Sequence, residues 1–293
     1  MATTALGNGL TVKAGRYLSG IGYVNEQHPH AWDFADQNLA YSAMLGEHYA
    51  QDGLQLKWVA PTPMFLEFGL EAAQGADWGD RNGLGSKAAF VHVGDDVGVS
   101  HAWRAGLSYL RVKAKGREGH WDDDNDVEAE TEFDGTSKFW IADFVWKWAP
   151  EGNPRYRNFK FQAEYVRREE DGDLSCEDNT PAGACPGITD SYDARQSGWY
   201  AQGVYQFHPQ WRVGYRYDRL DVGSVDFGPA FAGVLSKPDF TPKRQSLMLD
   251  YNPSEFSRLR LQFARDEAEQ GLKDNQITLQ YIHSLGPHGA HKF

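Results

Sequence analysis

Acidic and histidine side chains lie close together in one short stretch of the sequence: Glu26, His28, His30, Asp33 and Asp36. Imidazole nitrogens and carboxylate oxygens are ligands that bind divalent metals such as Zn²⁺. Close spacing alone does not make a site, however. The alternative interpretation is a polar loop that lines water, with both histidines hydrogen-bonded.

A second oxygen-rich stretch is the acidic run from Trp121 to Asp134. Its composition resembles that of calcium loops, but it lacks the glycine and the spacing of an EF-hand. A solvated external loop is the alternative. We therefore expect no resident cofactor, with zinc at 26–36 and calcium at this run as the two ions that the sequence could hold. Because the net charge is -12, an acidic mouth that attracts cations is also expected.

Two cysteines occur in the chain, Cys176 and Cys185. They flank a short stretch rich in polar residues, proline and alanine. This arrangement favours a small loop closed by a disulfide in an oxidising compartment. Two free thiols are the alternative, and a metal site is the weakest interpretation because no nearby histidine completes a ligand set.

Patterns typical of catalysis are missing from the sequence. Ser100–His101 and His283–Ser284 are neighbouring pairs, but adjacent residues of a strand point to opposite faces, so neither pair forms a dyad locally. There is no G-x-S-x-G motif, no phosphate-binding loop and no basic patch for nucleic acid. We expect neither an enzyme nor a nucleic-acid partner.

The elements that carry these residues alternate between short and long connections. Amphipathic segments are expected at 11–19, 53–61, 64–72, 86–93, 99–113, 137–148, 157–168, 196–207, 210–220, 243–251, 255–266 and 275–284. Tight turns near 61–63, 94–98, 151–154, 208–209 and 252–254 alternate with polar stretches at 73–85, 114–136, 169–195 and 221–242. Small turns on one side and large loops on the other are typical of a barrel that spans a bilayer. The sequence predicts an all-β, transmembrane antiparallel β-barrel of about 12 strands, built as a single domain over 1–293.

Composition agrees with this class. The chain has 10 Trp, 14 Tyr and 16 Phe, yet its mean hydropathy is -0.62. No apolar run is long enough for a transmembrane helix. A barrel strand shows lipid only at every second residue, so a hydrophilic average is expected.

Period-two alternation assigns the two faces of the strands. Trp199, Tyr205 and Phe207 are predicted to face lipid, and Tyr200 and Gln202 to face the lumen. The charged residues predicted to line a pore are Glu67, Glu71, Arg104, Lys160, Glu164, Arg212, Arg216, Asp218, Arg258 and Arg260. Opposed basic and acidic rows would set up a transverse field that favours polar solutes. Salt bridges within the lumen are the alternative explanation of the same residues.

Residues 19–52 break the rule of alternating connections. They follow a strand that ends Gly15-Arg16-Tyr17 and precede Gly53 to Trp58. This arrangement resembles the porin family, in which a long loop folds inward to constrict the channel. In the segment 139–148, Ile141 shares a face with Asp143, which is tolerable where such a loop packs inside the barrel.

More specifically, the stretch 15–36 and the ending His288 to Phe293 resemble the zinc-regulated, TonB-dependent-receptor-like outer-membrane proteins. Members of that group are longer at the N-terminus, so the resemblance implies that this chain is a C-terminal barrel portion. A TonB-dependent receptor also needs a plug domain and a larger barrel, for which this sequence has no room. Passive passage is therefore the simpler mechanism.

Together these inferences predict a porin-type channel in the outer membrane of a Gram-negative bacterium, for small polar solutes or ions, including cations or divalent metals. Expected partners are the lipid bilayer, lipopolysaccharide and the solutes, with a homotrimer as the assembly that many porins adopt. The alternatives are the barrel part of a metal or nutrient receptor, an outer-membrane enzyme, and a soluble β-rich binding protein whose outward aromatic rows are covered by a second layer.

Overall fold

A computed structural model describes residues 1–75, 78, 83–122, 128–176, 187–237, 239–254 and 256–284. These residues form a single antiparallel sheet of 13 strands, in which each strand pairs with the next along the chain. The strands are β1 (Ala2–Gly7), β2 (Leu10–Leu18), β3 (Ala50–Val59), β4 (Phe65–Ala73), β5 (Ser86–Val97), β6 (His101–Asp122), β7 (Glu128–Trp148), β8 (Asn158–Cys176), β9 (Ile188–His208), β10 (Trp211–Phe227), β11 (Lys243–Ser254), β12 (Ser257–Glu267) and β13 (Asp274–His283).

The predicted all-β architecture is confirmed, with one strand more than the sequence count. The additional strand is β1, which turns into β2 at Asn8 and Gly9. Both turn residues have positive φ, 50° and 79°, as the two-residue hairpins favoured by Asn-Gly require. This dipeptide was the signal that the count of amphipathic segments missed.

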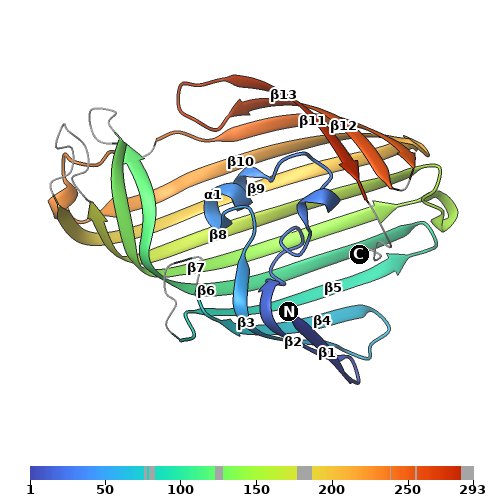
Figure 1. Cartoon of the computed structure of the whole chain (residues 1–293), viewed down its shortest axis with the longest axis horizontal. Coiled ribbons are helices and arrows are strands. Elements are labelled where there is room, and N and C mark those ends of the chain that lie inside the picture. The colour runs from blue at the N-terminus through green and yellow to red at the C-terminus, as the bar shows by residue number, and fades with distance from the viewer. Residues whose placement is uncertain are drawn as a thin grey trace.

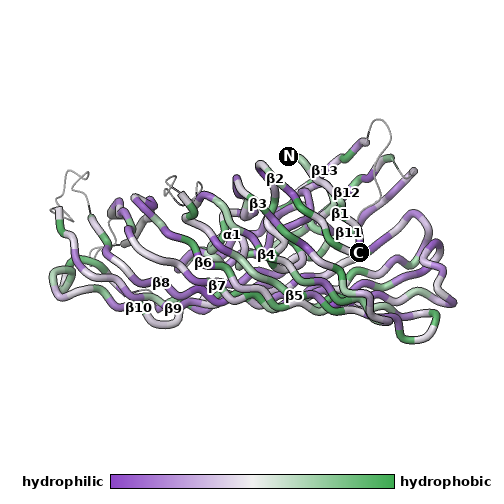
Figure 2. The backbone as a smooth tube through the Cα atoms, turned by 90° about the horizontal axis from the view of Figure 1, so that it is seen from below, coloured by the Kyte–Doolittle hydropathy of each residue, from purple (hydrophilic) through white to green (hydrophobic). Residues whose placement is uncertain are grey.

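The sheet curves into an open trough, with β1 and β13 at its two edges (Figures 1 and 2). Within the described strands, these edges do not pair with each other. No described helix combines the length and the apolar composition that a membrane crossing needs. The expectation of one domain over 1–293 stays a prediction, because residues 285–293 lie outside the described part of the chain.

Short connections fall within a few residues of the predicted turns, although 94–97 and 252–254 belong to the ends of β5 and β11. Two of the predicted long loops are wrong. The described residues of 114–136 and 169–195 are almost all strand, so that β6 has 22 residues and β9 has 21, whereas 221–242 is strand only as far as Phe227. At about 3.3 Å per residue, β6 is roughly 70 Å long, whereas about 9–11 residues cross a bilayer. These strands therefore extend well beyond a membrane on the side of the long connections. Their polar composition reflects solvent exposure and does not interrupt the ladder.

Residues 19–49 lie on the concave side of the sheet (Figure 1). They contain a 3₁₀ turn, η1 (Pro29–Ala31), and the short helix α1 (Leu39–Leu45). Two further 3₁₀ turns, η3 (Pro150–Gly152) and η4 (Pro229–Phe231), belong to connections between strands. The predicted inward-folded loop is confirmed, except that residues 50–52 of the predicted range begin β3, and the loop contacts strands of the wall from β4 to β12.

A hydrophobic cluster joins this loop to the wall. Ile21 and Tyr41 from the loop are fully buried and pack in one cluster with Ile141 of β7 and Val166 of β8. Burial of these apolar side chains against the loop explains why Ile141 and Asp143 share a face, as the sequence suggested. The loop is therefore held by apolar contacts as well as by the polar contacts described below.

The convex face carries the opposite composition. Leu56, Trp58, Phe68 and Leu70 are exposed and are cross-strand neighbours on β3 and β4. The same pattern continues on the convex face near the other edge of the sheet. The exposed residues of β11 to β13 there are Leu247, Leu249, Leu259, Leu261, Phe263, Ile277 and Leu279. Such a continuous apolar belt is typical of a surface that meets lipid.

Candidate functional site: a charged inner wall and its docked loop

The charged residues predicted to face the lumen lie on the concave side of the sheet. Glu67, Glu71, Arg104, Glu164, Arg216, Asp218 and Arg260 are buried there, and Lys160, Arg212 and Arg258 are partly buried. Their basic and acidic side chains are interleaved: Asp250 of β11 stands between Arg212 of β10 and Arg260 of β12 in the strand register. Salt bridges between neighbouring strands of the wall, the alternative named in the sequence analysis, describe this arrangement better than one basic row opposite one acidic row.

Glu71 of β4 fixes the beginning of the loop. Its carboxylate accepts hydrogen bonds from the Ser19 hydroxyl at 2.5 Å and from the Gly20 amide at 2.8 Å. Gln55 of β3 donates to the same carboxylate at 2.6 Å. Hydrogen bonds to a carboxylate are stronger than neutral ones, so this side chain ties the chain leaving β2 to the wall.

Glu164 of β8 is the second anchor of the loop. Its carboxylate accepts from the amides of Tyr23 and Val24 at 2.9 and 3.0 Å. It also accepts from the hydroxyls of Tyr41 at 2.8 Å and Tyr200 at 2.6 Å. Gly22 has a φ of +64°, and a Cβ at this position would collide with Tyr41 and Glu164. The backbone can therefore approach this carboxylate only with glycine at position 22.

Asp33 reaches the wall farther along the loop. It forms ion pairs with Lys160 and, at 3.2 Å, with Arg212, and Gln202 donates to it at 3.2 Å. Burial alone would raise the pKa of this carboxyl, but the two cations outweigh burial and hold the pKa below its ordinary value. Asp33 is therefore ionised in the docked loop.

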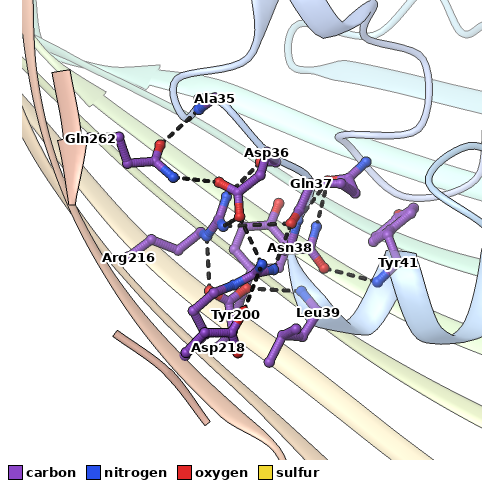
Figure 3. Close-up of polar contacts among 12 residues, drawn as sticks. Ala35, Asp36, Gln37, Asn38, Leu39, Tyr41, Tyr200, Arg216, Asp218 and Gln262 are labelled. Atoms are coloured by element: carbon purple, nitrogen blue, oxygen red, sulfur yellow. Dashed lines mark hydrogen bonds and ion pairs between the residues drawn. The ribbon is translucent and has the colours of Figure 1, made fainter. Parts of the chain in front are cut away.

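Asp36 makes a corresponding contact three residues later (Figure 3). Its carboxylate pairs with Arg216 at 3.0 Å and Arg244 at 2.9 Å, and accepts from Gln262 at 2.7 Å. Burial again opposes ionisation, and the two arginines lower the pKa of Asp36 overall. Strands β10, β11 and β12 thus all hold one side chain of the loop.

The start of α1 is capped by two groups. Asn38 accepts from the Tyr41 amide at 2.9 Å, as an N-cap residue does. Asp218 of β10 accepts from the Leu39 amide at 3.1 Å and from Arg216 at 2.9 Å. The negative charge of Asp218 next to the first helical amide is electrostatically favourable. The wall therefore determines where the helix begins.

The predicted metal ligands at 26–36 do not converge. Glu26 pairs with Lys13 at 3.5 Å and Lys57 at 3.7 Å, while the rings of His28 and His30 stack on each other at 5.7 Å. Asp33 and Asp36 point to the cations of the wall instead. Among the described residues, no group of three His, Cys, Asp or Glu side chains could hold a metal ion. The described residues therefore give the hypothesis of a zinc site at 26–36 no support, and it stays a prediction.

The predicted disulfide and the predicted calcium loop lie partly outside the residues that the structure describes. Cys176 is buried at the end of β8, but Cys185 lies outside the described residues, so the disulfide stays a prediction. The acidic run 121–134 includes residues 123–127, which are also outside, and its remainder belongs to the hairpin of β6 and β7. The suggestion of a calcium loop over the whole run therefore stays without structural support.

Arg244 is the main residue of the site that the sequence analysis missed. It stands at the second position of β11 and shares its face with Ser246, Met248 and Asp250. Alternation along 243–251 was the signal that could have found it. The same parity places Asp266 of β12 opposite Arg244, where the two pair at 3.5 Å.

Comparison with known proteins agrees with this geometry. No family model matches the chain. OprB of Pseudomonas putida superposes with a TM-score of 0.56 at 15% identity, over 96% of this chain and 70% of that protein. OmpT of Vibrio cholerae, an outer-membrane protein, superposes with a TM-score of 0.51 at 13% identity, over 89% of this chain and 67% of that one.

The fold is that of an outer-membrane β-barrel. This agrees with the predicted localisation in the bacterial outer membrane. An uncharacterised protein of Aquifex aeolicus is 29% identical in an alignment of 311 positions that covers 99% of this chain and 62% of that protein. The chain thus spans less than two thirds of this relative. The finer resemblance, to the zinc-regulated and TonB-dependent-receptor-like group, stays a prediction.

Proposed function

We propose that the chain forms the wall and the constriction of an outer-membrane channel through which small polar solutes or ions diffuse passively. The observation that carries this proposal is the contrast between the two faces of one sheet. The convex face is a belt of exposed leucine and aromatic side chains, and the concave face is a band of buried acidic and basic side chains. A soluble protein has no reason to expose the belt and to cover the charges.

The docked loop supports a constriction. Residues 19–49 occupy the concave side at the level of the charged band and are tied to β4, β8, β10, β11 and β12. A loop fixed at several points narrows a lumen without needing to move. We infer that the space left beside it sets the size of the solutes that pass.

Open space lies between the loop and the wall on the side of the short turns. One pocket of about 520 Å³ is lined by Glu26, Lys57, Glu67 and Arg104, among other residues. A second, of about 700 Å³, is lined by Asp33, Lys147, Lys160 and Arg212 together with the turns that follow β5 and β7. Charged walls around spaces of this size suit hydrated ions and small polar molecules.

The residues considered for catalysis have structural contacts instead. The Ser100 hydroxyl accepts from the Glu151 amide at 3.1 Å, and the His101 ring stacks on Trp146 at 5.6 Å. These contacts favour transport over catalysis as the role of the chain. Assembly as a homotrimer and contact with lipopolysaccharide remain predictions, and the exposed belt is the surface proposed to meet lipid.

Conductance across planar bilayers tests the proposal. The purified protein is expected to produce discrete, ohmic conductance steps, and the reversal potential in a salt gradient reports the charge preference. Because the histidines and carboxylates at 26–36 do not converge, micromolar zinc is expected to leave the conductance unchanged. A fully non-conducting protein would contradict the proposal and would favour a receptor or a structural role.

A further inference from the structure

Three arginines converge on one carboxylate at the short-turn end of the concave wall. Asp250 of β11 is fully buried and accepts from Arg260 at 2.8 and 3.1 Å. Arg212 of β10 donates to the same carboxylate, and Arg258 of β12 lies 3.7 Å from it. A single carboxylate can compensate only one of these three cations.

The other carboxylate in this region is Asp33 of the loop, and it is shared as well. It pairs with Arg212 and with Lys160, which adds a fourth cation to the group. In the ion pairs that Asp33 and Asp250 make with the described residues, four cationic side chains thus share two carboxylates. We call Lys160, Arg212, Arg258 and Arg260 the basic cluster. Excess positive charge that is partly withdrawn from water is unfavourable unless an anion accompanies it.

Two hydrogen-bond donors of the basic cluster also lack acceptors. Nε of Arg212 and Nη1 of Arg258 are buried and have no hydrogen-bond partner among the described residues. Buried N–H groups nearly always have an acceptor. The oxygens of a carboxylate or phosphate would supply acceptors and compensate the charge at the same time, which a water molecule would not.

Space for such a group lies beside two members of the cluster. The 700 Å³ pocket is lined by Arg212 and Lys160 together with Lys147, Asp33 and Asp96, and Trp148 and Phe159 are among its apolar lining residues. It lies on the concave side, so a lumenal solute can reach it and a lipid headgroup on the convex side cannot. The pocket is wider than a single ion requires, which suits a small organic anion.

We propose that the basic cluster binds the anionic group, carboxylate or phosphate, of a solute that passes along this wall. This inference rests on the proposed channel function and specifies its substrate class. An anion site here is opposite to the cation preference expected from the acidic external loops. The site decides the substrate class because a solute loses water at the constriction and not at the mouth. Arg258 is the decisive residue, since it contacts Asp250 and Asn252 but takes no part in docking the loop.

Inorganic phosphate is the probe for the test, in bilayers of phosphatidylcholine so that no anionic lipid competes. The chloride current of the wild-type protein is expected to fall with phosphate in a saturable manner. Arg258→Gln is expected to raise the half-inhibitory concentration about tenfold, the effect of losing one charge-assisted hydrogen bond. Arg258→Lys keeps the charge and is expected to lie between the two. The control is Arg265→Gln, on the same strand but exposed on the outer face, which should match the wild type.

Two outcomes separate the failure of this inference from the failure of the channel. Conductance without saturable phosphate inhibition, or with equal inhibition of wild type and Arg258→Gln, overturns the anion site and leaves the channel standing. If the protein does not conduct, calorimetric titration of phosphate into the detergent-solubilised protein decides the site by itself. Heat of binding that Arg258→Gln removes supports the site, and its absence from the wild type overturns it.

Discussion

Single carboxylates decide how the loop is held against the wall, and Glu164 is the clearest case. It accepts hydrogen bonds from two loop amides, one loop tyrosine and one wall tyrosine. Each of these donors would be left without an equivalent acceptor if the charge were removed. The side chain therefore joins residues 23, 24 and 41 of the loop to residue 200 of β9, far away in the sequence, at one point.

Glu164→Gln is expected to lower the free energy of unfolding by about 1–3 kcal/mol, because one of the two acceptor oxygens is replaced by an amide NH₂ group, so that two donors lose their acceptor. Thermal unfolding in detergent measures the change. Glu169→Gln is the matched control. Glu169 lies on the same strand, and its ion pair among the described residues is a partly exposed one with Arg167. The effect of this substitution should stay within about 0.5 kcal/mol. Equal effects of both substitutions would contradict an anchoring role for Glu164.

At the scale of elements, the sequence predicted on which face of the sheet a side chain lies better than it predicted which residues that side chain contacts. Alternation within each strand is a local property, so Glu71, Glu164 and Arg216 could be placed on the inner face before any contact was known. The partners of Asp33 are Lys160 and Arg212, more than a hundred positions away, and they depend on the path of residues 19–49. That path has no periodic pattern from which these partners could be predicted, and the close spacing of histidines and carboxylates in it suggested a metal site instead. The extent of β6 to β9 was missed because polar strand and polar loop look alike in composition.

The loop should respond to acid in a defined window. The pKa values of Asp33 and Asp36 are both lowered in the docked loop, after the cations outweigh the effect of burial. Groups with a lowered pKa contribute stability that is fully present above the ordinary carboxyl pKa of about 4 and is lost as the pH falls through the lowered value. Docking by these two residues is therefore constant from pH 8 to about 5 and weakens below about pH 4.

Single-channel recording over this pH range tests the behaviour of the loop. Conductance is expected to be steady down to about pH 5, with added fluctuations or larger steps at lower pH as the loop loosens. The double variant Asp33→Asn/Asp36→Asn should fluctuate already at neutral pH and change less on acidification. Loosening of the wild-type loop near pH 6 would show that other titrating groups control it.

At the scale of the whole molecule, the decisive property is which solvent meets the convex face. Leu247 and Leu272 are almost equally exposed, at 52% and 53%. Leu247 lies in β11 between Tyr215 and Phe263, within the apolar belt, while Leu272 lies in the connection between β12 and β13. In a water-soluble protein the two positions would tolerate a charge equally well.

Leu247→Arg is expected to destabilise the folded protein by about 2–4 kcal/mol in a lipid bilayer, the cost of an arginine near the midplane on the lipid face of a barrel. Leu272→Arg is expected to change stability by less than about 0.5 kcal/mol, because its side chain remains in water. Urea unfolding of the two variants in lipid vesicles gives the comparison. If both substitutions were equally mild, the belt would not face hydrocarbon, and neither the lumen nor the channel inferred from the two-faced sheet could stand.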